Sequence, residues 1–164
     1  MPQENYAAMI EAALKQEAML RFDHFTARDA YDLGVFITQR VYERGMEMAI
    51  CIRKANGHIL YQHCTQSTTL SNQSWMQRKF NTVMLTEGAS LRAWATLNLK
   101  GQTPQDQGVS ALDYAYCGGG FPIRLKTGEL VGAAIVSNLP HRDDHRFIVE
   151  ALSDYLDIPE VPFV

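Results

Sequence analysis

Residues 46–64 read MEMAICIRKANGHILYQHC, and this stretch decides the fold because it encodes two strands and the turn between them. From Met46 to Arg53, hydrophobic residues alternate with other side chains, which is the two-residue period of a strand with one buried face. Asn56-Gly57 is the strongest short signal for a β-hairpin, because a tight hairpin turn favours this pair. We therefore expect an antiparallel hairpin that returns along 58–64.

Two helices are expected before the hairpin. Apolar residues at helical spacing form one stripe over about 3–19, and a short extended segment over 20–25 follows. Thr26 is typical of an N-cap, with Asp29 three residues later as its capping-box partner. Gly45 is placed to end this second helix as the glycine just beyond its last turn.

Two further helices and a loop are expected after the hairpin. Asn72 or Ser71 would cap the first of these helices, and Ser90 would begin the second. The expected segments are a helix over about 73–85, a helix over about 91–99 and a polar loop over 100–110.

The last third of the chain predicts strands and one closing helix. Short turns separate apolar segments at 113–117, 120–125 and 130–139, and Asp143 or Asp144 would cap the final helix. The order of helices, hairpin, helices, strands and helix is not the regular alternation of a parallel α/β protein. We expect an α+β fold in which one mostly antiparallel sheet is flanked by helices.

Composition narrows the class of protein. A chain of 164 residues with 46% hydrophobic and 20% charged residues suits one domain, which we place over 1–164. A net charge of −3 disfavours a nucleic-acid-binding protein. We find neither a secretory signal nor an apolar run near the ~20 residues of a membrane span. Three cysteines without a C-x-x-C pair suit a reducing compartment, so we expect a cytoplasmic protein with no membrane partner.

Gly118, Gly119 and Gly120 form the most unusual stretch of the chain. Three successive glycines permit a positive φ and a close approach of another backbone or a ligand, and their N–H groups could form an anion-binding nest. The alternative is a β-bulge or a tight turn. A phosphate loop is excluded because the G-x-x-x-x-G-K-[ST] pattern is absent.

Lys79 is a second candidate. On a helical wheel it shares a stripe with Trp75 and Thr82, at the edge of the apolar sector. One interpretation is a lysine whose aliphatic stem covers the core while its amine reaches water. The other is a cation for a carboxylate ligand, such as a haem propionate.

Two histidines provide a candidate metal site. His141 and His145 are four residues apart, so on a helix both could face one metal ion. Asp143 and Asp144 between them are equally typical of capping at a helix N-terminus. Cys117, beside the glycines, is the thiol to watch, although a buried and inert thiol is the simpler interpretation.

The sequence contains four separated motifs: K-x-x-T (Lys79, Thr82) after Trp75, G-G-G-F-P-I (118–123), V-S-N-L (136–139) and D-H (Asp144, His145). Together they resemble the GlcG/HbpS-like family of haem-binding and haem-degrading domains. They also occur in its cytoplasmic branch, uncharacterised protein family 0303, where a tryptophan precedes the lysine by four residues. The likeness runs from about Leu20 to Leu156.

The resemblance implies a profilin-like sheet flanked by helices, a homo-oligomer, and a pocket near the glycines that Lys79 and His145 line. Haem or another small molecule is the ligand it suggests, so the cofactor stays open with haem as a candidate. The residues that would bind such an anionic ligand are Lys79, Thr82, Gly118, Gly119, Gly120 and His145.

Three hypotheses follow. The first is a small-molecule binding domain of unproven activity, with haem binding or degradation as candidates. The second is a non-enzymatic, oligomeric interaction protein in which the same motifs maintain fold and subunit contacts. The third is a metal-dependent enzyme that uses His141 and His145.

Overall fold

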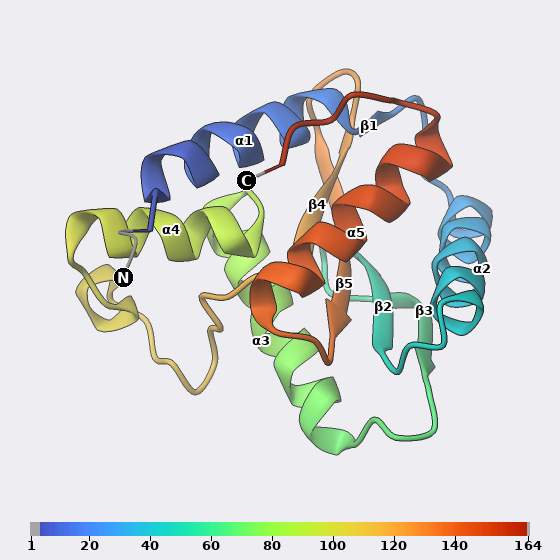
Figure 1. Cartoon of the computed structure of the whole chain (residues 1–164), viewed down its shortest axis with the longest axis horizontal. Helices are drawn as coiled ribbons and strands as arrows, with labels where there is room; N and C mark the ends of the chain where they lie inside the picture. Colours follow the sequence, from blue (N-terminus) through green and yellow to red (C-terminus); the bar gives the residue numbers. More distant parts are fainter. Residues whose placement is uncertain (1–3, 164) are drawn as a thin grey trace.

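The computed structural model describes residues 4–163, which form helices packed on both faces of one open sheet (Figure 1). Its elements, in chain order, are α1 (Tyr6–Met19), β1 (Arg21–Phe22), α2 (Ala27–Glu43), β2 (Ala49–Lys54), β3 (Ile59–Cys64), α3 (Leu70–Thr86), α4 (Ser90–Lys100), the 3₁₀ turn η1 (Pro104–Gln107), β4 (Gly120–Leu125), β5 (Leu130–Ser137) and α5 (His141–Leu156).

The sheet has the strand order β1-β4-β5-β2-β3. Only the short β1 runs parallel to its neighbour β4, and the other pairs are antiparallel. The expected α+β fold with a mostly antiparallel sheet is therefore confirmed. Successive residues of β2 and β5 point to opposite faces: Ile50 lies in the core cluster under α2 and α5, whereas Cys51 lies in the cluster under α3.

The hairpin is confirmed, but the expectation of one buried face is wrong. Gly57 has a φ of +91°, and the Lys54 N–H donates to the carbonyl oxygen of His58 at 2.9 Å to close the turn. The strand begins at Ala49, and both of its faces are buried because β2 lies between β5 and β3 with helices above and below. Even Arg53 is only 3% exposed.

Capping residues were predicted correctly for one helix and wrongly for two. Thr26 caps α2, and its capping box with Asp29 is complete. In α3 the N-cap is Thr69, and the Asn72 side chain accepts from the Thr69 N–H at 2.9 Å, so Asn72 is the capping-box partner instead. In α5 the helix begins at His141, which places Asp143 and Asp144 inside its first turn.

The segment 113–117 is not a strand. Its backbone bonds to a helix rather than to a neighbouring strand, because the Ala115 N–H donates to the carbonyl oxygen of Arg78 in α3 at 3.1 Å. The expected loop at 100–110 contains the short turn η1, and β5 ends at Ser137 instead of 139.

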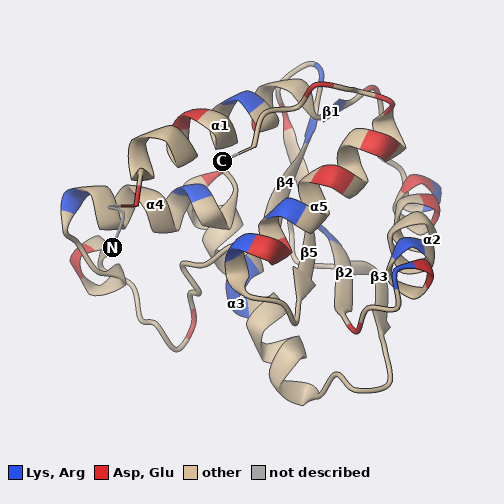
Figure 2. Cartoon of the chain, in the orientation of Figure 1, with Lys and Arg blue, Asp and Glu red and all other residues tan. Residues whose placement is uncertain are grey.

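Basic and acidic residues are interspersed on α2 and α5, whereas the chain from β3 into the first half of α3 is tan in Figure 2. Residues 65–77 contain no Lys, Arg, Asp or Glu. Among residues 4–163, no helix is both long enough and apolar enough to cross a membrane.

Candidate ligand-binding cavity

A cavity of about 660 Å³ opens where α3, β5 and α5 meet, a volume within the usual range for small-molecule sites. Three elements supply most of its wall: the start of α3, the end of β5 and the first turn of α5, with Trp94 from α4. Its lining residues are Ser67, Thr69, Ser71, Asn72, Trp75, Lys79, Trp94, Cys117, Ser137, Asn138, Leu139, His141 and Asp144.

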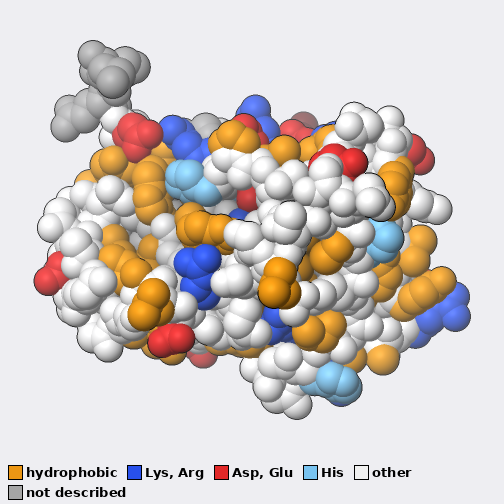
Figure 3. Space-filling view, turned by 90° about the horizontal axis from the view of Figure 1, so that it is seen from below, with side chains coloured by type: hydrophobic (Ala, Val, Ile, Leu, Met, Phe, Trp, Pro, Cys, Tyr) orange, Lys and Arg blue, Asp and Glu red, His pale blue; other side chains and the backbone are white. Residues whose placement is uncertain are grey.

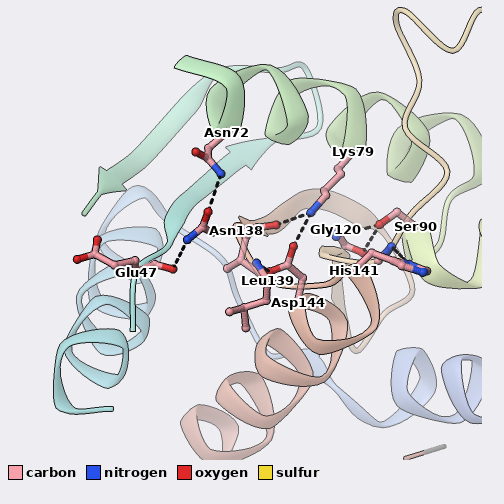
Figure 4. A network of polar contacts seen from close by, with 11 residues as sticks. Glu47, Asn72, Lys79, Ser90, Gly120, Asn138, Leu139, His141 and Asp144 are labelled. Atoms are coloured by element: carbon pink, nitrogen blue, oxygen red, sulfur yellow. Dashed lines mark hydrogen bonds and ion pairs between the residues drawn. The ribbon is translucent and has the colours of Figure 1, made fainter. Parts of the chain in front are cut away.

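Lys79 lies at the base of this cavity in an internal ion pair (Figure 4). Its Nζ is 2.9 Å from Asp144 Oδ2 and donates to the carbonyl oxygen of Val136 at 2.9 Å, and the side chain is only 3% exposed. The other carboxylate oxygen of Asp144 accepts from the Leu139 N–H at 3.0 Å. The charge of Lys79 is thus already compensated.

Burial raises the pKa of Asp144, while the ammonium of Lys79 and the backbone N–H donors act in the opposite direction. A buried pair of this kind is tolerated because each charge is satisfied by its partner and by backbone groups. The Lys79 ammonium bonds to Val136 and Asp144 instead of reaching water, so the interpretation of a lysine whose amine reaches solvent is wrong.

The three glycines leave room for protein atoms. Gly119 has a φ of +124°, and a Cβ there would lie 2.6 Å from Lys79 Nζ and 2.6 Å from the Val136 oxygen. A Cβ on Gly118 would overlap the carbonyl oxygen of His141, and one on Gly120 would lie 2.7 Å from Val83 Cγ2. The triplet lets β4 start directly against α3 and α5, beneath the ion pair.

His141 faces the cavity in one defined protonation state. Its Nδ1 accepts from the Gly118 N–H at 3.1 Å, and its ring packs edge-on to Trp94 with centroids 4.7 Å apart. A backbone N–H can only donate, so the neutral ring must carry its proton on Nε2. Burial, followed by the nearby Arg142 and Lys79, lowers the pKa of His141, which favours this neutral donor form.

His145 points away from the cavity, although it follows Asp144 directly. Its Nε2 lies 2.8 Å from Gln16 Oε1, while Gln16 Nε2 donates to the carbonyl oxygen of Pro162 at 2.7 Å. These bonds fix a proton on Nε2 and leave the buried Nδ1 without a partner in residues 4–163. Burial, with a smaller contribution from His141, lowers the pKa of His145 to about 4.

The two histidines therefore do not converge on one point. His141 is bonded to Gly118 and His145 to Gln16 of α1. Within the described chain, no cluster of three or more His, Cys, Asp or Glu side chains is placed to hold a metal ion. Thr82 is also internal, since its hydroxyl donates to the Arg78 carbonyl oxygen of its own helix at 3.2 Å.

Cys117 lines the cavity, and burial raises the pKa of its thiol above the ordinary value. The protonated thiol is therefore the form at neutral pH, which makes it a poor nucleophile and a poor metal ligand. Its position beside the glycines was visible in the sequence, whereas its protonation state depends on the fold around it.

Sequence reasoning missed the amide network at the rim of the cavity. Asn138 donates through Nδ2 to the carbonyl oxygen of Glu47 at 2.9 Å and accepts from Asn72 Nδ2 at 3.3 Å (Figure 4). Its φ of 159° lies at the edge of the region that glycine favours. This side chain ties the end of β5 to α3 and to the segment before β2, which fixes the shape of the rim.

The tryptophan wall was missed as well. Trp75 and Trp94 both line the cavity, and they are the two tryptophans of the chain. Trp75 was noted in the sequence only for its spacing from Lys79. One signal in the sequence could have revealed this wall: both tryptophans of the chain lie in predicted helices that precede the loop with the three glycines.

A family model described as "Haem degrading protein HbpS-like" matches residues 25–153. A UPF0303 protein of Yersinia enterocolitica is 33% identical over 156 residues, which are 94% of this chain and 92% of that protein. The crystal structure of the Ybr137w protein superposes with a TM-score of 0.84 at 27% identity and covers 90% of this chain and 87% of that one. The structure of a PduOC:haem complex is similar in fold, with a TM-score of 0.66, 15% identity and coverage of 79% and 93%.

The close approach at Gly119 is testable with alanine. Gly119→Ala and Gly101→Ala both force a side chain into a positive-φ conformation, which costs about 1–3 kcal/mol at either site. Only at Gly119 does the new Cβ meet Lys79 and Val136, since nothing lies within 4 Å of the position at Gly101. We expect a larger loss of unfolding free energy in urea for Gly119→Ala. Equal losses would show that the glycine does not serve the ion pair.

His145 makes stability depend on pH. Its pKa is about 4 in the fold and about 6.5 in the unfolded chain, so between these values the unfolded state binds more protons. The stabilisation is complete above pH 6.5 and falls by about 3 kcal/mol as pH drops to 4. In urea titrations, His145→Gln should flatten this part of the profile, whereas His58→Gln, at an exposed histidine, should not. Parallel profiles for wild type and His145→Gln would contradict the assignment.

Proposed function

The chain belongs to the HbpS-like haem-degrading protein family, and we propose that it binds a flat organic molecule in the 660 Å³ cavity. The observation that carries this proposal is the wall itself. Trp75 and Trp94 both contribute large aromatic side chains to the lining, together with neutral hydrogen-bonding groups. Apolar walls with a few placed polar groups are typical of small-molecule sites.

The charges and hydrogen-bonding groups of the lining favour a ligand whose part inside this cavity is uncharged. Lys79 and Asp144 are the charged side chains in the lining, and they neutralise each other. The Nε2–H of His141 supplies a fixed donor for a ligand acceptor. The remaining polar groups are hydroxyls and amides that accept or donate, from Ser67, Thr69, Ser71, Asn72, Ser137 and Asn138.

Haem is the ligand that the family description and the PduOC complex suggest. Iron is held in proteins by His nitrogen, Cys thiolate, Met or Tyr. His141 offers a protonated Nε2 because its Nδ1 accepts from Gly118, and Cys117 is held as a thiol. The cavity residues do not fit iron coordination, and Lys79 is not free for a propionate.

The binding proposal is testable through the two tryptophans. Pyrenebutanol, a flat and uncharged probe, should quench their emission with saturation, and haemin should compete with it. Ser71→Tyr narrows the cavity and should weaken pyrenebutanol binding about tenfold, whereas Ser74→Tyr on the same helix, outside the lining, should not.

Two outcomes would contradict the binding proposal, and a third would contradict the argument against iron ligation. Pyrenebutanol that fails to saturate the quenching of wild-type protein would remove the binding site and favour the interaction-protein hypothesis. Equal affinities for both tyrosine variants and wild type would place binding elsewhere. A haemin titration in which His141→Gln abolishes a shifted Soret band would show iron ligation that the hydrogen bond to Gly118 argues against.

We also propose that the protein is a homo-oligomer. Large apolar side chains stand in solvent, with Leu70 78% and Leu112 85% exposed, and a subunit contact would remove them from water. Light scattering at micromolar concentration should give a mass that is a multiple of 18.5 kDa. A stable mass near 18.5 kDa would refute this prediction.

A cytoplasmic location is proposed on the state of the thiols. Cys51, Cys64 and Cys117 are all free, with Cys64 exposed. An exposed free thiol persists in a reducing compartment and is readily oxidised outside one.

A further inference from the structure

A second cavity, of about 390 Å³, adjoins the first and shares Trp75, Trp94 and Cys117 with it. Figure 3 views the molecule from the side on which α3 lies in Figure 1, where hydrophobic and basic side chains are exposed next to one another. Besides these three residues, its lining includes Arg78, Tyr114, Ala115 and Tyr116.

Arg78 is the cation of this second cavity, and no acidic side chain among residues 4–163 forms an ion pair with it. Its guanidinium carbon lies 3.9 Å from the centroid of the Trp75 ring. Within residues 4–163 its side chain makes no ion pair within 4.0 Å and no hydrogen bond, whereas Arg28 pairs with Asp32 and Arg92 with Glu17. None of the residues that line this cavity is acidic.

The surroundings of Arg78 are held in place by the loop that precedes the glycines. The Ala115 N–H donates to the Arg78 carbonyl oxygen at 3.1 Å, and Asn81 Nδ2 donates to the Asp113 carbonyl oxygen at 2.7 Å. These bonds fasten residues 113–115 to α3. They bring Tyr114 and Tyr116 to the same cavity as the guanidinium.

A guanidinium stacked on an aromatic face keeps its N–H fork free, and this fork matches the two oxygens of a carboxylate or phosphate. We propose that the ligand is a flat aromatic molecule with a carboxylate or phosphate group, which Arg78 binds in the second cavity. This inference rests on the proposed function, because the aromatic part would lie against Trp75 and Trp94 in the first cavity. Arg78, and not the neighbouring Lys79 that the sequence suggested, is then the residue that binds the anionic group.

The different surroundings of Lys79 and Arg78 on α3 support this division between a cavity for the neutral ring and a cavity for the anionic group. Lys79 forms an ion pair with Asp144 inside the protein, so it offers no net positive charge to an anionic group at the base of the first cavity. Arg78 is partly exposed and has five N–H donors available. The shared tryptophan wall lets one molecule contact both sites at once.

The test compares pyrenebutyrate with pyrenebutanol, which share the ring system and chain and differ in the carboxylate. Energy transfer from the tryptophans reports binding of both. Wild-type protein should bind pyrenebutyrate about tenfold more tightly, as expected for one charged hydrogen-bonded contact. Arg78→Met keeps an apolar stem over Trp75 and should abolish this preference, while pyrenebutanol affinity stays within about twofold.

Arg28→Met is the matched control, because Arg28 also lies over an aromatic ring, that of Tyr31, but outside both cavities. It should retain the full preference. A wild-type preference near one, or an unchanged preference in Arg78→Met, would overturn the role of Arg78 and leave the proposed function intact. Failure of pyrenebutanol itself to bind would instead remove the proposed function. Should Arg78→Met fold poorly in thermal melts, Arg78→Gln and the wild-type preference decide the question.

Discussion

The buried ion pair between Lys79 and Asp144 is the contact on which the arrangement of this cavity depends. It joins α3 to α5, and the bond from Lys79 to Val136 adds the end of strand β5. Removing one partner from such a pair strands the other charge away from water, at a cost of about 3–5 kcal/mol. The crossing of three elements at one point also explains Gly119, because no side chain fits between the ammonium and the β5 backbone.

The parts of the fold that were predicted from sequence are those set by neighbours along the chain. The capping box of Thr26 and Asp29, and the turn at Asn56-Gly57, each depend on residues a few positions apart. The buried second face of β2 depends on α3, which covers it from a distant part of the chain. Residues 113–117 have strand-like composition, yet their backbone partner is a helix carbonyl, which no local pattern encodes.

The candidate site shows the same limit at the level of single side chains. Lys79 and Asp144 stood in separate motifs 65 residues apart, so their pairing required the fold. Adjacent helical residues are turned by about 100° from each other, and this rotation separates residues that the sequence groups together. Asp144 therefore meets Lys79, while His145 meets Gln16 on a different side of α5.

The same rotation separates Arg78 from Lys79, and the two cations consequently play different parts. Lys79, the inner cation, links α3 to α5, and it presents no net charge to a ligand because Asp144 compensates it. Arg78, the outer cation, lies over Trp75 and lines a cavity that has no acidic side chain. Its positive charge therefore acts on a ligand that enters this cavity. A molecule bound across the tryptophan wall is thereby oriented: its neutral ring faces the compensated interior, and its anionic end faces Arg78.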